Sequence, residues 1–462
     1  MEVTHELLAI QNPWWQSGKI KFDPVLLSFH NQAGDKAPEW LAAIKLKEPA
    51  IYTLYGARGL GKTTGLKLLI ERLIKKGKKP RDIFYYSCRN VGTYEQLNEI
   101  IKLFLAIRQD KKKRLYIFID EISAVKNWGK GIEYLRQAGK FKNANLILSA
   151  SRCDSLKADS MSGRIKKNKF ITIQSKDFCS FIKDINPRLG ENIIEKNFAH
   201  YKNKLEYYLD AYLLTGGFIS TINSFKKFGA VEQHIYDDYL GRLTMDMAGS
   251  NRDIMLWHQI MERLVTHLGH PIGHQTIARR TKAKTHLTIG EYVEIMERMF
   301  MLKTVYQSDR FGRAKKSKAK KIFFTDPFLF WLFYSHLCGS LDNWHFSRER
   351  LHDQEIFNAL IENIVLSHLV EKEQNYKNSE SIMFWRDNIK KREINFVFKN
   401  KNGICPILIR YNREIKESDF ALMLEAGFKN GIIISRDKLE LRGKIKVIPL
   451  VYFLLFSEKL LK

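Results

Sequence analysis

The feature that most constrains the fold is a glycine-rich turn between a short apolar segment and an amphipathic helix. Residues 51–55 read Ile-Tyr-Thr-Leu-Tyr, the pattern Gly56-x-x-x-x-Gly61-Lys62-Thr63 follows, and helical spacing begins at Thr64. Glycines let the backbone curl so that amide N–H groups point inward, at the positive end of the helix dipole. A strand, this turn and a helix, in that order, predict a phosphate-binding loop (P-loop) in a parallel α/β sheet.

The spacing also predicts what each part of the loop does. Lys62 is expected to reach the β- and γ-phosphates of a nucleotide, and the Thr63 hydroxyl to coordinate magnesium. The expected ligands are therefore ATP and Mg²⁺. The residues expected to bind them are Gly56, Ala57, Arg58, Gly59, Leu60, Gly61, Lys62, Thr63 and Thr64. A chance glycine-rich turn is the alternative, and the flanking strand and helix argue against it.

A second apolar segment, residues 115–119, ends in Asp120-Glu121. Carboxylates at the carboxyl end of a parallel strand lie at the edge where nucleotides bind. We expect Asp120 to hold magnesium directly or through water, and Glu121 to polarise the attacking water. Two exposed carboxylates after a buried strand are the alternative.

Two further residues are candidates for contact with the γ-phosphate. The apolar segment 146–148 runs into Ser149, whose hydroxyl is predicted to act as a sensor, although a plain serine-rich turn explains the pattern almost as well. Arg164 is a candidate arginine finger, in its own or a neighbouring subunit. An exposed arginine in a basic run explains Arg164 equally well.

Length and composition predict several domains in a reducing cytoplasm. A chain of 462 residues is too long to fold around one hydrophobic core. Its content of 45% hydrophobic residues is enough to form several cores. The five cysteines show no metal-ligand or disulfide spacing. The sequence also lacks a signal-peptide pattern and an apolar run long enough to span a bilayer, so no membrane contact is expected.

The order of apolar patterns predicts an α/β architecture: a P-loop parallel sheet with a helical lid, then a winged helix and a smaller α/β domain. Alternating strands and helices stop near residue 181, and helical spacing follows. Three helices and a hairpin then predict the winged helix. The expected divisions are an N-terminal arm (1–50), the P-loop core (51–183), the lid (184–250), the winged helix (251–326), a helical connector (327–354) and a separate C-terminal domain (355–462).

Basic residues outnumber acidic ones by 77 to 50, which favours a polyanionic partner such as DNA. The sharpest cluster lies in the expected wing, residues 310–321, interpreted as a flexible loop that becomes ordered on contact. The predicted nucleic-acid contacts are Arg279, Arg280, Lys284, Arg313, Lys315, Lys316, Lys318 and Lys320. A solvated charged loop on a winged helix that binds protein is the alternative.

The assembled motifs resemble the prokaryotic, archaeal-type AAA ATPases that join a P-loop core to a winged helix and a C-terminal restriction-endonuclease-like module. The resemblance rests on residues 56–64, 117–122 with Asn127-Trp128, 149–151, 162–164, Gly216-Gly217-Phe218, 323–327 and 360–365. It implies binding of ATP and magnesium and weak hydrolysis, with a homo-oligomer among its possibilities.

The C-terminal part departs from the nuclease pattern. Such modules hold metal with an Asp and a Glu-x-Lys, and the corresponding places here are Asn395, Leu408 and Arg410. Asn395 lacks the charge, Leu408 cannot bind metal, and Arg410 stays protonated. Glu362 and Glu393 remain, but the module is predicted to be degenerate.

Three functions remain open at this point. The leading hypothesis is an ATP-driven switch in which nucleotide state reorients the winged helix and terminal module on DNA or a partner. A protein-interaction or assembly ATPase without DNA contact is the alternative, and an ATP-regulated nuclease is the least favoured. Salt-dependent DNA binding separates the first two.

Overall fold

The computed structural model describes residues 4–20, 23–31, 37–107, 113–153, 168–193, 195–309, 311–372, 380–401 and 403–461. The chain divides into two compact units, Met1–Gln174 and Ser175–Lys462. None of the helices in these ranges combines the length and apolar character needed to cross a bilayer.

The first unit is built on a five-stranded parallel sheet in the order β2-β3-β4-β1-β5. Its strands are β1 (Ile51–Tyr55), β2 (Ile83–Ser87), β3 (Leu115–Asp120), β4 (Ala144–Ala150) and β5 (Asn168–Thr172). β3 and β4 are buried along their whole length, as expected for central strands covered on both faces. With the glycine-rich loop between β1 and the next helix, this sheet has the P-loop NTPase fold.

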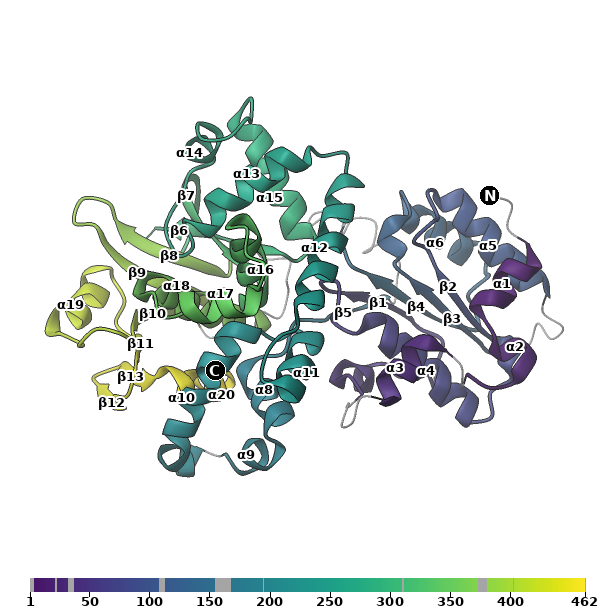
Figure 1. Ribbon diagram of the computed structural model, residues 1–462, viewed down its shortest axis with the longest axis horizontal. Helices are drawn as coiled ribbons and strands as arrows, with labels where there is room; N and C mark the ends of the chain where they lie inside the picture. Colours follow the sequence, from purple (N-terminus) through teal and green to yellow (C-terminus); the bar gives the residue numbers. More distant parts are fainter. Residues whose placement is uncertain are drawn as a thin grey trace. The chain divides into compact units, whose positions relative to one another are not determined.

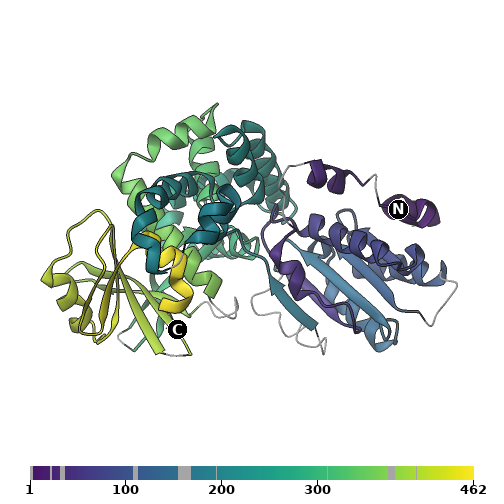
Figure 2. The same ribbon diagram turned by 90° about the horizontal axis from the view of Figure 1, so that it is seen from below.

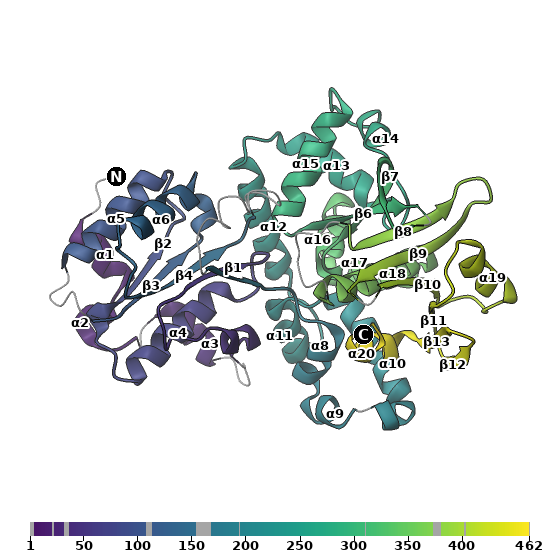
Figure 3. The same cartoon turned by 180° about the vertical axis from the view of Figure 1, so that it is seen from behind.

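Helices cover both faces of this sheet. On one side lie α3 (Pro24–Asn31) and α4 (Lys62–Lys75), and on the other α5 (Tyr94–Ile107) and α6 (Trp128–Gln137) (Figure 1; the reverse side is seen in Figure 3). Strand β5 was not predicted from the sequence. It is an edge strand with mostly exposed or half-buried side chains, so it lacks the apolar run that identifies the buried strands.

The N-terminal segment covers the other edge of the sheet, at β2. It contains α1 (His5–Gln11) and α2 (Trp14–Ser17). The Asn12 side chain accepts a hydrogen bond from Tyr85 N at 2.7 Å and donates one to Tyr85 O at 2.9 Å. The indole N–H groups of Trp14 and Trp15 both donate to the carbonyl of Ile83. Side chains therefore satisfy backbone groups that an uncovered edge would expose for pairing with another chain.

Helices dominate the start of the second unit, in the segment expected to form the lid. They are α8 (Phe178–Ile185), α9 (Pro187–Asn192), α10 (Phe198–Thr215), α11 (Ile219–Phe228) and α12 (Gln233–Ala248). The described residues also contain short 3₁₀ helices. The first unit has η1 (Glu39–Ala43), η2 (Pro80–Asp82) and η3 (Ile122–Ala124), and the second has η4 (Glu195–Asn197). The compact unit begins at Ser175, so α8 belongs here, although the sequence placed residues up to 183 in the P-loop core.

Three helices and a hairpin follow, in the order expected for a winged helix. They are α13 (Ile254–Val265), α14 (His274–Ala278), α15 (His286–Arg298), β6 (Leu302–Ser308) and β7 (Ala314–Phe324). The prediction of a flexible loop over the basic run is wrong from Ala314 onward, because this part of the run is strand. Its pairing with β6 is interrupted: Gln307 faces Lys315, whereas Tyr306 faces Lys320. Lys316 and Lys318 therefore lie on a bulge of the hairpin.

The rest of the chain completes a mixed sheet. Its helices are α16 (Pro327–Leu337), α17 (Asn343–Arg350), α18 (Gln354–Lys372), α19 (Glu417–Glu425) and α20 (Leu450–Leu460). Its strands are β8 (Ile382–Asp387), β9 (Arg392–Asn400), β10 (Gly403–Arg410), β11 (Gly431–Ser435), β12 (Glu440–Arg442) and β13 (Ile445–Pro449). They appear in green and yellow in Figure 2.

The hairpin and the C-terminal strands form one eight-stranded sheet, in the order β12-β13-β11-β10-β9-β8-β6-β7. β6 pairs parallel with β8 through Tyr306 opposite Met383 and Gln307 opposite Phe384. The sequence pattern predicted a separate C-terminal domain, whereas hydrogen bonding joins the hairpin to it. Periodicity within each strand cannot show which strands pair when they are far apart in the chain.

Candidate nucleotide site and basic surface

The turn after β1 has the backbone shape that a phosphate-binding loop requires. Gly59 and Gly61 have φ values of +78° and +74°, a region that side chains disfavour. At Gly56 a Cβ atom would lie 2.3 Å from the carbonyl oxygen of Ile173. Glycine is therefore needed for the conformation at two positions and for close approach of the backbone at a third.

Lys62 is the first residue of α4 and points back over the loop. Its Nζ donates hydrogen bonds to the carbonyls of Gly56 and Ala57, each at 2.8 Å. The side chain is almost fully buried, at 5% exposure. The ammonium is therefore held at the mouth of the loop, where it can reach a phosphate by exchanging carbonyl partners for phosphate oxygens.

Asp120, at the end of β3, collects three hydroxyl groups. Thr63 Oγ1 donates to Asp120 Oδ2 at 2.7 Å, and Tyr85 Oη donates to the same oxygen at 2.9 Å. Ser149 Oγ donates to Oδ1. The Thr63–Asp120 contact brings together the two residues predicted to hold Mg²⁺. Hydroxyl and carboxylate oxygens are the donors that this ion prefers, so the residues present fit it.

Glu121 is placed by an unusual backbone conformation. Its φ of +54° lies in the left-handed region, and its N–H donates to Ser149 Oγ at 3.1 Å. The carboxylate accepts a hydrogen bond from Ser151 Oγ at 2.7 Å. Strain of this kind persists where the surroundings hold it. Here the Ser151 hydroxyl orients the Glu121 carboxylate at the end of β3.

Of the two residues predicted to contact the γ-phosphate, Ser149 lies within the described residues and Arg164 does not. Ser149 is fully buried and is engaged by Asp120 and by the backbone of Glu121, so its place is between the two acids. Arg164 lies outside the described residues, which skip 154–167. The roles proposed for both remain predictions.

Sequence reasoning gave no role to Tyr85 and Lys67, and it included Ser151 only as part of the run 149–151. Tyr85 lies on β2, which pairs with β3 so that Ser87 is opposite Asp120. Lys67, on α4, is buried, forms an ion pair with Asp23 at 2.9 Å and stands 3.7 Å from the centroid of the Tyr85 ring. Burial lowers the pKa of Lys67, against the attraction of Asp23. Only Ser151 had a local signal, since it directly follows β4, the strand that carries Ser149.

The predicted nucleic-acid residues are mostly exposed. Arg279, Arg280 and Lys284 lie exposed between α14 and α15. On the hairpin, Arg313, Lys315, Lys316 and Lys318 are exposed, whereas Lys320 is half-buried. Two of these are paired: Arg313 Nε with Asp309 at 2.8 Å and Lys316 Nζ with Glu380 at 2.7 Å. Arg310 lies outside the described residues.

Lys321, the last of the basic run, does not face solvent. It is 1% exposed, and its Nζ lies 2.6 Å from Glu362 Oε1 on α18 and 2.5 Å from Glu393 Oε1 on β9. Burial disfavours its charge, but the attraction of both glutamates outweighs burial and raises the pKa of Lys321. An ammonium thus stands between the two carboxylates that survive from the nuclease pattern. Lys321 belongs to the basic run but not to the predicted nucleic-acid contacts, and it lies in the buried end of β7.

The other altered nuclease positions are also engaged by protein groups. Asn395 Oδ1 accepts a hydrogen bond from Ile409 N at 2.9 Å. Arg410 Nε donates to Asp419 Oδ1 at 2.7 Å. These side chains hold β9, β10 and α19 together.

Two motifs that supported the family resemblance meet in space. Asp326 Oδ2 accepts a hydrogen bond from Gly217 N, and its Oδ1 accepts one from Phe328 N at the start of α16, both at 2.9 Å. A Cβ on Gly216 would lie 1.8 Å from Asp326 Oδ1, and one on Gly217 would lie 2.0 Å from Lys176 O. The glycine pair therefore admits a buried carboxylate that joins the helical segment to α16.

Comparison with known families agrees with the nucleotide site. Residues 48–179 match the family model described as an AAA domain. Residues 206–333 and 357–453 match two domains of unknown function, DUF8612 and DUF4143. The N-terminal part of the chain is thus an AAA-type P-loop ATPase domain, whose fold binds nucleotide.

Individual relatives are similar to this chain over part of its length. An uncharacterized protein of Methanocaldococcus jannaschii is 30% identical over 182 residues, which span 38% of this chain and 37% of that protein. Among solved structures, Aeropyrum pernix ORC1 in complex with DNA is 14% identical, with a TM-score of 0.31 over 71% of this chain and 90% of that one. The Thermotoga maritima RuvB Holliday junction branch migration motor is 17% identical, with a TM-score of 0.28 over 55% and 81%. Likeness this low carries no argument about function.

Proposed function

We propose that this protein binds ATP with Mg²⁺, hydrolyses it, and uses its nucleotide state to control contact with DNA or a partner through the hairpin and C-terminal sheet. The observation that carries the first part is the convergence of Lys62, Thr63, Asp120 and Glu121 at one edge of the sheet. A cation for phosphates, a hydroxyl–carboxylate pair for metal and a second carboxylate for water are the parts that phosphoryl transfer needs.

The chain's own residues divide this work. Lys62 neutralises charge on the terminal phosphates, and the loop amides orient the phosphate chain. Thr63 and Asp120 would hold Mg²⁺, which supplies charge stabilisation at the phosphate oxygens when bound. Glu121, fixed by Ser151, accepts a proton from the attacking water.

Exposed cations support the DNA part of the proposal. Arg279, Arg280 and Lys284 precede α15, and Lys315 and Lys318 stand exposed on the hairpin. The alternative is an assembly ATPase whose winged-helix segment contacts protein. Nuclease action is disfavoured because the Lys321 ammonium is already paired with Glu362 and Glu393, the two carboxylates left to hold a metal. The cysteine spacing favours the cytoplasm as the place of action.

Replacement of Lys62 tests the ATP site. Lys62→Ala removes the charge facing the β- and γ-phosphates, so we expect loss of ATP binding, measured by titration calorimetry, and of phosphate release. Lys75→Ala, at the exposed end of the same helix, is the matched control and should leave both unchanged. Undiminished ATPase activity in Lys62→Ala would remove the site assignment.

Replacement of the hairpin cations tests DNA contact. We expect weaker binding to every duplex, with a flatter salt dependence, when these five residues are changed to Ala: Arg313, Lys315, Lys316, Lys318 and Lys320. Each phosphate contact that is lost means that fewer counterions leave the DNA on binding. Mobility shifts over a salt series measure both, and ATP affinity is the control. Equal affinity and equal salt slope would favour the assembly ATPase. A change in ATPase rate on adding duplex DNA, at low and high salt, tests the coupling.

A further inference from the structure

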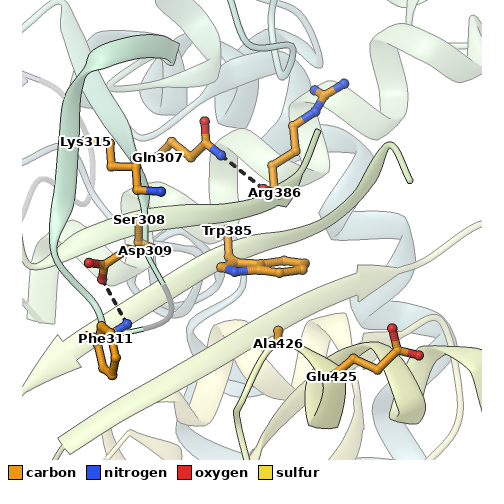
Figure 4. Close-up of a pocket in the computed structure, with 9 residues that line it drawn as sticks. All are labelled: Gln307, Ser308, Asp309, Phe311, Lys315, Trp385, Arg386, Glu425 and Ala426. Atoms are coloured by element: carbon orange, nitrogen blue, oxygen red, sulfur yellow. Dashed lines mark hydrogen bonds between the residues drawn. The ribbon is translucent and has the colours of Figure 1, made fainter. Parts of the chain in front are cut away.

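A cavity of about 340 Å³ opens beside the basic hairpin, within the second unit. It lies between the β6–β7 turn, the end of β8 and the end of α19 (Figure 4). Its walls include Trp385, Phe311, Ser308, Gln307, Lys315 and Arg386. This size and mixture of aromatic and polar groups are typical of small-ligand sites.

The cavity offers aromatic faces to a planar ligand. Trp385 packs partly against the core of the sheet, and its ring lies between the hairpin and the end of α19 (Figure 4). Phe311, in the hairpin turn, leaves 60% of its surface exposed. Exposed aromatic rings beside cations are the usual platform for nucleobases, because every base has a face that can stack.

One buried hydroxyl in the cavity wall lacks a hydrogen bond. Ser308 is 1% exposed, and within the described chain its Oγ has no partner. Its neighbour Gln307 is satisfied, since Nε2 donates to the Arg386 carbonyl at 3.0 Å (Figure 4). A buried hydroxyl without a partner costs stability, and a bound ligand with a donor or acceptor would remove that cost.

The charge of the cavity favours an anion. Asp309 accepts from Phe311 N, Arg313 N and Arg313 Nε, and these contacts, the Arg313 backbone first, lower its pKa. Glu425 is paired with Arg392 and, at 3.7 Å, with Lys390. Both carboxylates of the wall are thus already matched by cations, whereas Lys315 forms no ion pair with the described residues. Lys315 therefore adds net positive charge.

We propose that this cavity binds one nucleotide unit, with an unpaired base on Trp385, a polar base edge at Ser308 and the phosphate at Lys315. The same chemistry is offered by a free mononucleotide and by an unpaired base of a single strand. Binding of a single strand rests on the proposed nucleic-acid contact, whereas binding of a free mononucleotide does not.

Calorimetry on the full chain tests the proposal, in a Lys62→Ala background so that the P-loop does not capture the probes. The probes are deoxyadenosine monophosphate, a short oligothymidylate and a fully paired duplex. Trp385→Ala should lose about tenfold or more in affinity for the mononucleotide or the oligothymidylate. Ser308→Ala should lose about fivefold. Its thermal midpoint should stay the same or rise, because the variant removes an unsatisfied buried group.

The double variant Lys316→Ala, Lys318→Ala is the matched control, since neither residue lines the cavity. It should weaken duplex binding and leave mononucleotide binding unchanged. Binding of the oligothymidylate alone would identify strands as the source, and binding of the mononucleotide alone would identify a free ligand. Absence of binding to both, unchanged affinity in Ser308→Ala, or a lower midpoint in that variant would overturn the cavity proposal, whatever happens to the duplex. If the protein without hairpin substitutions binds the mononucleotide but no duplex, only the DNA proposal is overturned.

Discussion

At the scale of single residues, the nucleotide site is organised by hydroxyl groups around two carboxylates. Asp120 accepts from Thr63, Tyr85 and Ser149, and Glu121 accepts from Ser151. A carboxylate can accept about four hydrogen bonds, so Asp120 keeps room for one more contact. Hydroxyl donors orient both acids, and these neutral groups leave the negative charge of the acids available to a metal ion and a water molecule.

Glu121→Gln should keep ATP affinity and slow hydrolysis by about 10²-fold or more, because the amide cannot accept a proton from water. Glutamine still offers an oxygen to the Ser151 hydroxyl, so local structure should be kept. Single-turnover hydrolysis and nucleotide binding measure the two effects separately.

Glu133→Gln on α6 is the control for Glu121→Gln, since Glu133 pairs with Arg136 on the surface. It should change neither quantity. Weaker binding with an unchanged rate per bound ATP would argue that Glu121 serves to bind and not to activate water.

At the scale of elements, Asp326 joins two segments that are far apart in the chain. It caps α16 through Phe328 N and binds Gly217 N beyond the end of α10. Both of its oxygens therefore face N–H donors. Burial raises its pKa to about 6, against the hydrogen bonds from Ser175, Gly217 and Phe328.

Asp326→Asn should destabilise the fold by about 1–3 kcal/mol, because its NH₂ group must face one of the two N–H donors. The deficit should depend on pH. The folded pKa lies above the ordinary 3.8, so the native state binds a proton before the unfolded state does. Wild-type stability therefore rises as pH falls through about 6, and the variant lacks this gain.

Denaturant unfolding of both proteins measures the difference in stability between them. That difference should widen by about 2 kcal/mol from about pH 7.5 to about pH 4.5. A constant difference over this range would show that the folded pKa of Asp326 is not raised.

At the scale of the whole molecule, the second unit is tied together by a buried charge cluster. Lys321 on β7 meets Glu362 on α18 and Glu393 on β9, and Arg386 on β8 lies 3.5 Å from Glu393. A charged side chain that is buried away from water needs an oppositely charged partner inside the protein. The hairpin that carries the exposed cations is therefore anchored in the same sheet as the C-terminal strands.

Lys321→Ala should lower the free energy of unfolding by about 3–5 kcal/mol at neutral pH, since it leaves the buried Glu362 without its cation and leaves Glu393 with Arg386 alone. Burial raises the pKa of Glu362, and the attraction of Lys321 opposes that rise. Without the ammonium the native variant therefore takes up a proton at Glu362 more readily as pH falls, and the deficit shrinks. Lys318→Ala, exposed on the same strand, should change stability by less than about 0.5 kcal/mol. An unchanged unfolding midpoint in Lys321→Ala at neutral pH would contradict the buried cluster.

The sequence by itself determined the P-loop sheet and its chemistry. Gly56 to Thr63, the acid pair at the end of β3 and the apolar runs of the buried strands each carry a local signal, because turn geometry and continuous burial depend on neighbouring residues. The helices and hairpin after Asp253 were predictable for the same reason. Confirmation extends to the AAA-type domain and the α/β fold, while the domain boundaries and site roles stay predictions.

Only the tertiary structure decided which distant residues meet. The hairpin joins the C-terminal sheet, Lys321 turns inward to two glutamates, Tyr85 reaches Asp120, and the cavity beside Trp385 is assembled from three segments. A basic run looks uniform in sequence, but along β7 Lys315, Lys316 and Lys318 are exposed, whereas Lys321 is buried. The two glutamates that make Lys321 part of a core lie far along the chain, on α18 and β9, where no local pattern records them.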